Sequence, residues 1–155
     1  MSVDIVSELS GDRLAELIRS NIEMESLDFK ESLDLASLRG RAELAKDVLA
    51  MANTFGGHLL IGFEDRTHEL VGISHETEGE IRNSESLNDK LRRYCGSHIT
   101  VYSACHVLPL PTGGSATCGL IYIPPFEGPG GKVRVRDMIV AIRLLSFWIP
   151  ITERI

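Results

Sequence analysis

One stretch, residues 42–73, constrains the fold more than any other part of the chain. Its first part, residues 42–54, repeats apolar side chains at helical spacing with charged side chains between them, which predicts an amphipathic helix. Gly56 and Gly57 end that helix, because glycine adopts the left-handed conformation of a helix terminus without steric penalty. The apolar positions are Leu44, Ala45, Val48, Leu49, Ala52 and Phe55. The helix must therefore turn sharply into the segment that follows.

That following segment predicts strands. Residues 59–63 form an apolar run that ends on two adjacent acids, Glu64 and Asp65, and residues 70–73 predict a short strand that returns as a hairpin. An acid pair at the point where a buried strand meets a turn is a candidate site, because such turns present functional groups on a rigid scaffold.

An earlier segment, residues 27–31, alternates apolar and charged side chains, which is the period of a half-buried strand. Leu27 and Phe29 are then expected to face the core, while Asp28 and Lys30 share the opposite face.

The remaining patterns complete an α+β fold. Two further helices and an antiparallel pair of strands are predicted, and the order of elements lacks the regular alternation of a doubly wound sheet. We therefore expect a two-layer sandwich, a mixed β-sheet with helices packed on it. The expected elements are helices at 10–20 and 84–95, strands at 99–108 and 116–123, a polar linker at 37–41, an acidic loop at 74–83 and a possible last strand at 132–136.

The length of 155 residues and a hydrophobic content of 43% predict one domain, residues 1–155, with a single core. No apolar run reaches the ~18–20 residues of a membrane span, and the N-terminus lacks the pattern of a signal peptide. A cytoplasmic protein without membrane contact is expected. The apolar segment at 138–155 ends abruptly, which is compatible with a chain cut from a longer protein or with burial against a partner.

The cysteines predict reduced thiols in the core. Cys95, Cys105 and Cys118 are odd in number and irregularly spaced, which does not suit a disulfide framework. Together with His98 and His106 they could suggest zinc, but no closely spaced Cys pair is present, so no zinc is expected.

The acids at the predicted strand ends could hold a divalent cation. Glu23, Asp28, Glu64 and Asp65 offer the oxygen ligands that Mg²⁺ or Mn²⁺ prefers, and such a site could activate water or clamp a phosphodiester. Lys30 could stabilise charge on the phosphate. The alternative is that these residues are solvated charges at strand edges.

A net charge of −6 argues against non-specific binding of polyanions, so any contact with nucleic acid must come from a local basic face. Each basic cluster could equally be a solvated surface. The candidate nucleic-acid-binding residues are Arg39, Arg41, Lys90, Arg92, Arg93, Lys132, Arg134 and Arg136.

Four motifs together carry a resemblance to a known family. Glu23 is followed after four residues by Asp28, then Phe29 and Lys30; an Ala-x-Ala-Asn-Thr-x-Gly-Gly motif fills residues 50–57; an Ile-Gly-x-x-Asp motif ends at Asp65; and a hydrophobic-Gly-hydrophobic turn follows. The combination resembles the Schlafen-type AlbA-like domain.

The resemblance implies a nucleic-acid-binding domain. In Schlafen proteins three acids form a metal-dependent ribonuclease site acting on transfer and ribosomal RNA, whereas many bacterial relatives are described only as DNA-binding modules. By position the acids fall on Glu23, Asp28 and Asp65, and the lysine on Lys30. Asp28 replaces the usual glutamate and is one methylene shorter. The resemblance implies Mg²⁺ or Mn²⁺ as cofactor and RNA rather than DNA as partner.

The residues that match the family motif most closely also have a structural explanation. Asn53, Thr54, Gly56 and Gly57 can end a helix and pack it closely on a strand. Their backbone N–H groups could also hold a phosphate.

Two alternatives to the endoribonuclease remain open. One is a non-catalytic DNA- or RNA-binding module of a regulatory or defence protein. The other is an assembly domain that forms a homodimer through the apolar residues 139–149.

Overall fold

A four-stranded sheet and five helices make up the described part of the chain. The computed structural model describes residues 4–20, 22, 24, 26–96 and 98–126. The helices are α1 (Ile5–Glu8), α2 (Gly11–Ser20), α3 (Leu38–Ala52), α4 (His75–Arg82) and α5 (Ser84–Cys95), and the strands are β1 (Leu27–Lys30), β2 (Gly57–Ile61), β3 (Tyr102–Pro109) and β4 (Ser115–Ile123). None of these helices is long and apolar enough to cross a membrane.

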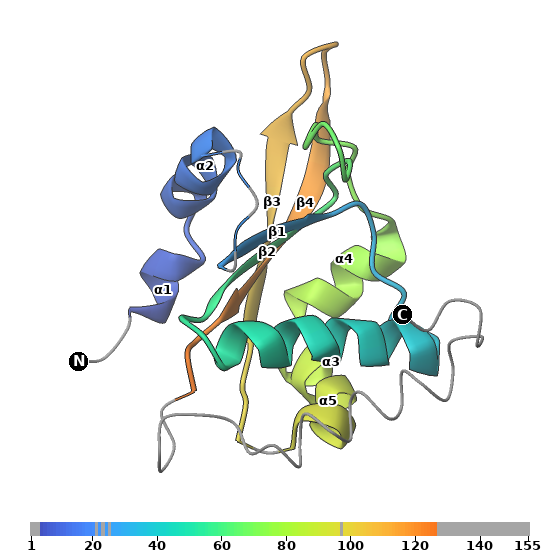
Figure 1. Ribbon diagram of the computed structural model, residues 1–155. Coiled ribbons are helices and arrows are strands. Elements are labelled where there is room, and N and C mark those ends of the chain that lie inside the picture. Colours follow the sequence, from blue (N-terminus) through green and yellow to red (C-terminus); the bar gives the residue numbers. More distant parts are fainter. Residues whose placement is uncertain (1–3, 21, 23, 25, 97, 127–155) are drawn as a thin grey trace.

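The sheet is mixed, with the strand order β1-β2-β4-β3. Strands β1 and β2 are parallel and are connected through α3, whereas β4 runs antiparallel to both β2 and β3. Strand β1 therefore forms one edge, with Asp28 opposite Leu59 and Lys30 opposite Ile61 (Figure 1). The expected α+β fold, a mixed sheet with helices packed on it, is confirmed.

Helices cover both faces of this sheet (Figure 1). On one face α3, α4 and α5 pack against the side chains that point toward them from β2 and β4, among them Leu59, Ile61 and Ile121. On the other face α2 contributes Leu14 and Leu17 to a second cluster. The remaining buried members of this second cluster are Leu27, Phe29, Leu60, Phe63, Cys118 and Leu120.

Helix α3 begins earlier than the sequence pattern indicates. The expected polar linker at 37–41 is wrong, because Ser37 is the N-cap and accepts a hydrogen bond from Gly40 N at 2.9 Å. Asp34 in turn accepts a hydrogen bond from Ser37 N, and its pKa is lowered chiefly by its hydrogen bond from the Ser37 hydroxyl. A serine cap supplies a partner for a backbone donor that no helical carbonyl can reach.

The expected acidic loop at 74–83 is also wrong, because α4 occupies it. Ser74 caps this helix by accepting from Thr77 N at 3.1 Å, and Glu76 and Glu78 lie in its first turn, where they complement the positive end of the helix dipole. Only Ile81 of this helix is buried. The helix therefore lacks the repeated apolar positions on which a prediction from periodicity depends.

The expected return strand at 70–73 is reduced to a single bridge between Phe63 and Leu70. After it, the backbone N–H groups of Val71 and Gly72 both donate to Gly62 O, at 2.7 and 2.9 Å. Gly62 has a φ of 101°, a conformation that favours glycine, so the chain bends here instead of continuing as a ladder.

Candidate functional site

The described acids and lysine of the family motif lie at the edge strand β1. Lys30 Nζ is 3.2 Å from Asp28 Oδ2 and 2.8 Å from Asp47 Oδ2 of α3. Burial alone would lower the pKa of Lys30, but the hydrogen bonds and charges of Asp47 and Asp28 outweigh it and raise the pKa. The ammonium group is therefore held in its charged form between two carboxylates.

Asp47 is the member of this cluster that the sequence did not reveal. In the helical pattern it counts among the charged residues on the far side from the core, but it immediately precedes the buried Val48 and lies at the border of the packed face. Helix α3 connects the parallel strands β1 and β2, and its Asp47 contacts the side chain of Lys30 on β1. A polar residue beside an apolar stripe was the available signal.

Asp65, which follows β2, contacts the chain just after the end of β1. Its Oδ1 accepts a hydrogen bond of 3.2 Å from the backbone N–H of Glu31, the residue after Lys30. This contact fixes the turn after β2 against the end of β1. Asp28 and Lys30 thus lie on β1, and Asp65 contacts the backbone just after this strand.

Glu64, unlike the adjacent Asp65, forms its hydrogen bonds within its own turn. Its Oε2 accepts hydrogen bonds from the Arg66 and Thr67 N–H groups and from the Thr67 hydroxyl, at 3.0, 2.5 and 2.7 Å. These bonds, above all the one from the Thr67 hydroxyl, lower the pKa of Glu64. The adjacent acids are thus divided: Glu64 holds the turn together, whereas Asp65 reaches β1.

The carboxylates of Asp28 and Asp65 are oxygen ligands of the kind that a hard cation prefers. Asp28 and Asp65 provide carboxylate oxygens on the same sheet edge, and Lys30 shares Asp28 with any cation that binds there. Within the described residues no three His, Cys, Asp or Glu side chains are grouped so that they could hold a metal. Glu23, the third acid of the motif, lies outside the described residues.

The candidate basic residues are mostly engaged by acids or backbone. Arg39 pairs with Glu43, Lys90 with Glu80 and Arg92 with Asp89, while Arg41 Nε donates to Leu35 O at 2.6 Å. Arg93 is exposed, with no ion-pair partner in the described part of the chain.

Two of the candidate basic residues line one cleft of about 200 Å³. They are Arg41 and Lys90, which are 49 positions apart, and Glu80 lines the same cleft. Lys132, Arg134, Arg136 and the apolar residues 139–149 lie outside the described residues.

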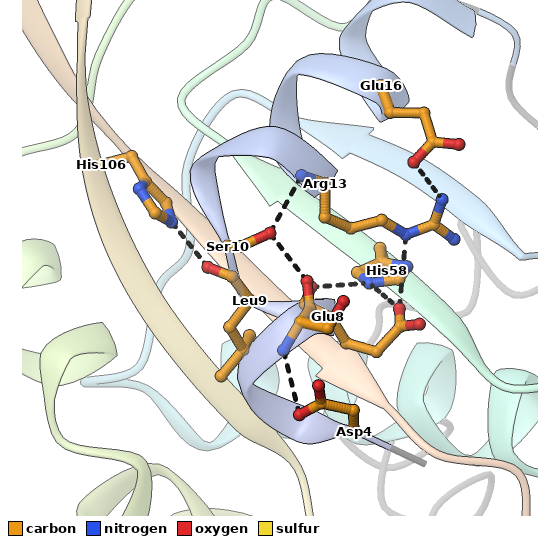
Figure 2. Close-up of polar contacts among 9 residues, drawn as sticks. Asp4, Glu8, Leu9, Ser10, Arg13, Glu16, His58 and His106 are labelled. Atoms are coloured by element: carbon orange, nitrogen blue, oxygen red, sulfur yellow. Dashed lines mark hydrogen bonds and ion pairs between the residues drawn. The ribbon is translucent and has the colours of Figure 1, made fainter.

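A second polar cluster, which the sequence did not indicate, joins the N-terminal helices to the sheet. His58 of β2 has an exposed fraction of 3%, and its Nε2 lies 3.1 Å from Glu8 O and 3.0 Å from Glu8 Oε2. Figure 2 shows Glu8 between His58 and Arg13, and Arg13 pairs with Glu16. Since a carbonyl can only accept, Nε2 carries the proton of the bond to Glu8 O.

His106 of β3 makes a similar contact with the carbonyl of Leu9, the residue after Glu8. Its Nε2 donates to Leu9 O at 2.8 Å (Figure 2). Two histidines thus satisfy consecutive carbonyls at the end of α1, where helical carbonyls lack partners within the helix. A histidine in an apolar strand pattern gives no indication of such a contact.

The buried His58 makes stability depend on pH. Burial lowers its pKa below the usual 6.5, the carbonyl and carboxylate of Glu8 act in the opposite direction, and Arg13 adds to the decrease. As pH falls below about 6.5, the unfolded chain takes up a proton that the folded chain resists, so stability decreases. We expect the urea midpoint of the native protein to fall between about pH 7.5 and about pH 5.

The matched variant for that measurement is His58→Gln, whose amide can still donate to Glu8 O but does not titrate in this range. Its urea midpoint should change less over the same interval. Equal acid sensitivity of the two proteins would show that other groups cause the effect.

The three cysteines are free thiols, in agreement with the prediction. Cys95 and Cys118 are buried, and Cys105 is half-buried. Burial raises the pKa of Cys118 to about 12, so this thiol stays protonated at neutral pH and is a poor nucleophile.

The fold and this edge define a class of protein: an α+β domain with an acid-x-Lys edge strand, a helix ending in Asn-Thr-x-Gly-Gly, and an aspartate that returns to the edge strand. A family model for the Schlafen, AlbA_2 domain matches residues 23–140, which is more than half of the chain. The chain belongs to this family, and the predicted resemblance is confirmed. Membership indicates a nucleic-acid-binding domain. A search of curated proteins finds no match.

Proposed function

We propose that this protein binds RNA in preference to DNA and cleaves structured RNA, such as transfer RNA, with Mg²⁺ or Mn²⁺ as cofactor. The observation that carries the proposal is the charged Lys30 fixed beside Asp28 at an accessible sheet edge that Asp65 also reaches. Glu23, Asp28 and Asp65 would hold the cation. A bound cation would supply an activated water molecule and neutralise phosphate charge.

The residues of the edge suit such a role. The raised pKa of Lys30 keeps its ammonium group charged, so that it can stabilise negative charge on a phosphodiester beside Asp28. Asp47 positions Lys30 from the opposite side at 2.8 Å. The hydrogen bond from Glu31 N orients Asp65 toward the same strand.

Cleavage of labelled transfer RNA in the presence of Mn²⁺ tests the enzymatic proposal. Asp65→Ala should reduce the rate about 100-fold or more, because loss of a metal ligand affects binding at least as strongly as loss of its supporting contacts. Glu31→Ala is the matched control, since it removes an adjacent exposed acid whose side chain is not assigned to the site. The proposal fails if the native protein cleaves no faster than Asp65→Ala.

A non-catalytic nucleic-acid-binding module is the second candidate. The ion pair between Lys30 and Asp28 favours it, because a metal ion that bound at Asp28 would have to compete with the ammonium group of Lys30 for this carboxylate. This candidate predicts RNA binding that weakens steeply with added salt and is unchanged by a chelator of divalent cations. Filter binding over a salt series with and without chelator distinguishes it from the metal-dependent enzyme.

A further inference from the structure

A cleft of about 440 Å³ opens where the N-terminal helices meet the start of the sheet. Its lining includes Arg13 and Glu16 of α2, Phe55 and Gly56 of the turn after α3, and the buried His58 of β2. This volume is within the range of about 300–1,000 Å³ that is typical of sites for small ligands. In Figure 1 the turn from α3 into β2 lies on the same side of the molecule as α1 and α2.

Phe55 is unusual among the residues that line this cleft, because it is a large apolar side chain exposed to solvent. It is 81% exposed although the core takes up the apolar residues around it, and it lies in a turn fixed by hydrogen bonds from Thr54 N and Gly56 N to Met51 O, at 3.1 and 2.8 Å. The backbone on both sides of this exposed ring is thus held by hydrogen bonds. A preorganised exposed ring has little conformational entropy to lose when another flat group stacks on it.

The charges of the cleft favour a neutral polar ligand over a phosphate. Glu8 and Glu16 outnumber Arg13, and the lowered pKa of His58 keeps its imidazole neutral at physiological pH. The side chain of Glu16 is 60% exposed, so its carboxylate can accept hydrogen bonds from N–H groups of a ligand. A nucleobase combines a neutral ring for stacking with N–H donors at its edge.

We propose that this cleft holds one unpaired nucleobase of a bound RNA, stacked on Phe55 with its N–H edge toward Glu16. The inference rests on the proposed RNA-binding function and assigns it a base subsite. Met24 and Leu27 also line the cleft, so the subsite lies at the start of β1, on the sheet face that carries α2. Lys30, at the end of the same strand, points to the opposite face and contacts Asp47 of α3.

The helices that build one wall precede the family match, which begins at residue 23. Arg13 and Glu16 are positioned by α2, and the contacts of Glu8 with His58 and Arg13 hold the two helices on the sheet. The subsite is thus formed jointly by the family domain and by the segment before it.

Titration of a short single-stranded RNA carrying 2-aminopurine tests the proposal, because the fluorescence of this base is quenched on stacking. Phe55→Ala should weaken binding about tenfold, as expected for loss of one base–aromatic stack, and should abolish the quenching. Phe55→Trp should retain both. The matched control is Val107→Ala, which truncates another exposed apolar residue, 61% exposed, on β3.

A duplex of the same sequence should be insensitive to Phe55→Ala, because its bases are already paired and stacked. Native-like thermal unfolding of Phe55→Ala is expected, since the side chain is exposed. If the native protein binds the RNA and Phe55→Ala binds it equally well, the base subsite is overturned and the proposed function stands. If the native protein binds no RNA, both are overturned.

Discussion

Substituting alanine for Gly56 is expected to lower the free energy of unfolding by about 3 kcal/mol. Gly56 has a φ of 73°, and a Cβ atom at this position would lie 2.5 Å from Ile123 O and 2.7 Å from Pro125 N. The left-handed conformation alone costs about 1 kcal/mol for alanine, and displacing packed backbone adds about 1–3 kcal/mol. Urea unfolding followed by circular dichroism measures the change.

Two other glycines separate these contributions. Gly113 has a φ of 98° but open space around it, so Gly113→Ala should cost only the backbone term of about 1 kcal/mol. Gly79 lies within α4 and also has open space, so Gly79→Ala should stabilise the protein by about 0.5–1 kcal/mol. A cost for Gly56→Ala no larger than for Gly113→Ala would contradict the close packing of α3 on the end of β4.

Truncating Leu14 to alanine is expected to reduce the free energy of unfolding by about 2–5 kcal/mol. Leu14 of α2 is 1% exposed and packs in the cluster with Leu60, Phe63 and Leu120 on the sheet face opposite α3. The loss combines reduced burial of apolar surface with the cavity that remains. This substitution tests whether the segment before the family match is an integral part of the core.

Val6→Ala is the appropriate control for Leu14→Ala. Val6 lies on the preceding helix α1 but is 81% exposed, so its truncation should change stability by less than about 0.5 kcal/mol. Urea unfolding of both variants, with unchanged dependence on denaturant, makes the comparison quantitative. Similar midpoints for Leu14→Ala and the native protein would mean that α2 contributes little to the core.

Elements with a strong local pattern were predictable from the sequence. Helix α5 was predicted with the bounds Ser84–Cys95, and the β3–β4 hairpin and β1 were predicted to within a few residues. Each has regular apolar spacing bounded by turn residues, so the information lies within the element itself. The Gly56–Gly57 turn was predicted to end a helix, and the close approach of Gly57 to Ser26 O explains why a side chain is excluded there.

Elements without that spacing were missed for a physical reason. Helices α1 and α4 bury at most one residue each, so the apolar stripe that marks an amphipathic helix is absent. Both are short and are held by a side-chain cap, Asp4 or Ser74, and by their tertiary contacts. Isolated helices of this length are marginal in water, so packing decides whether they form.

The sequence by itself determined the family, the α+β class and the shared strand face of Asp28 and Lys30, because motif spacing and periodicity are local properties. Only the tertiary structure decided that Asp47 is the second acid paired with Lys30, that Glu8 contacts His58 across 50 positions, and that α2 and Phe55 line the same cleft. Periodicity shows which face of an element is buried, but not which side chains of another element lie against it. Those neighbours follow from the strand order and from the helices that cross it.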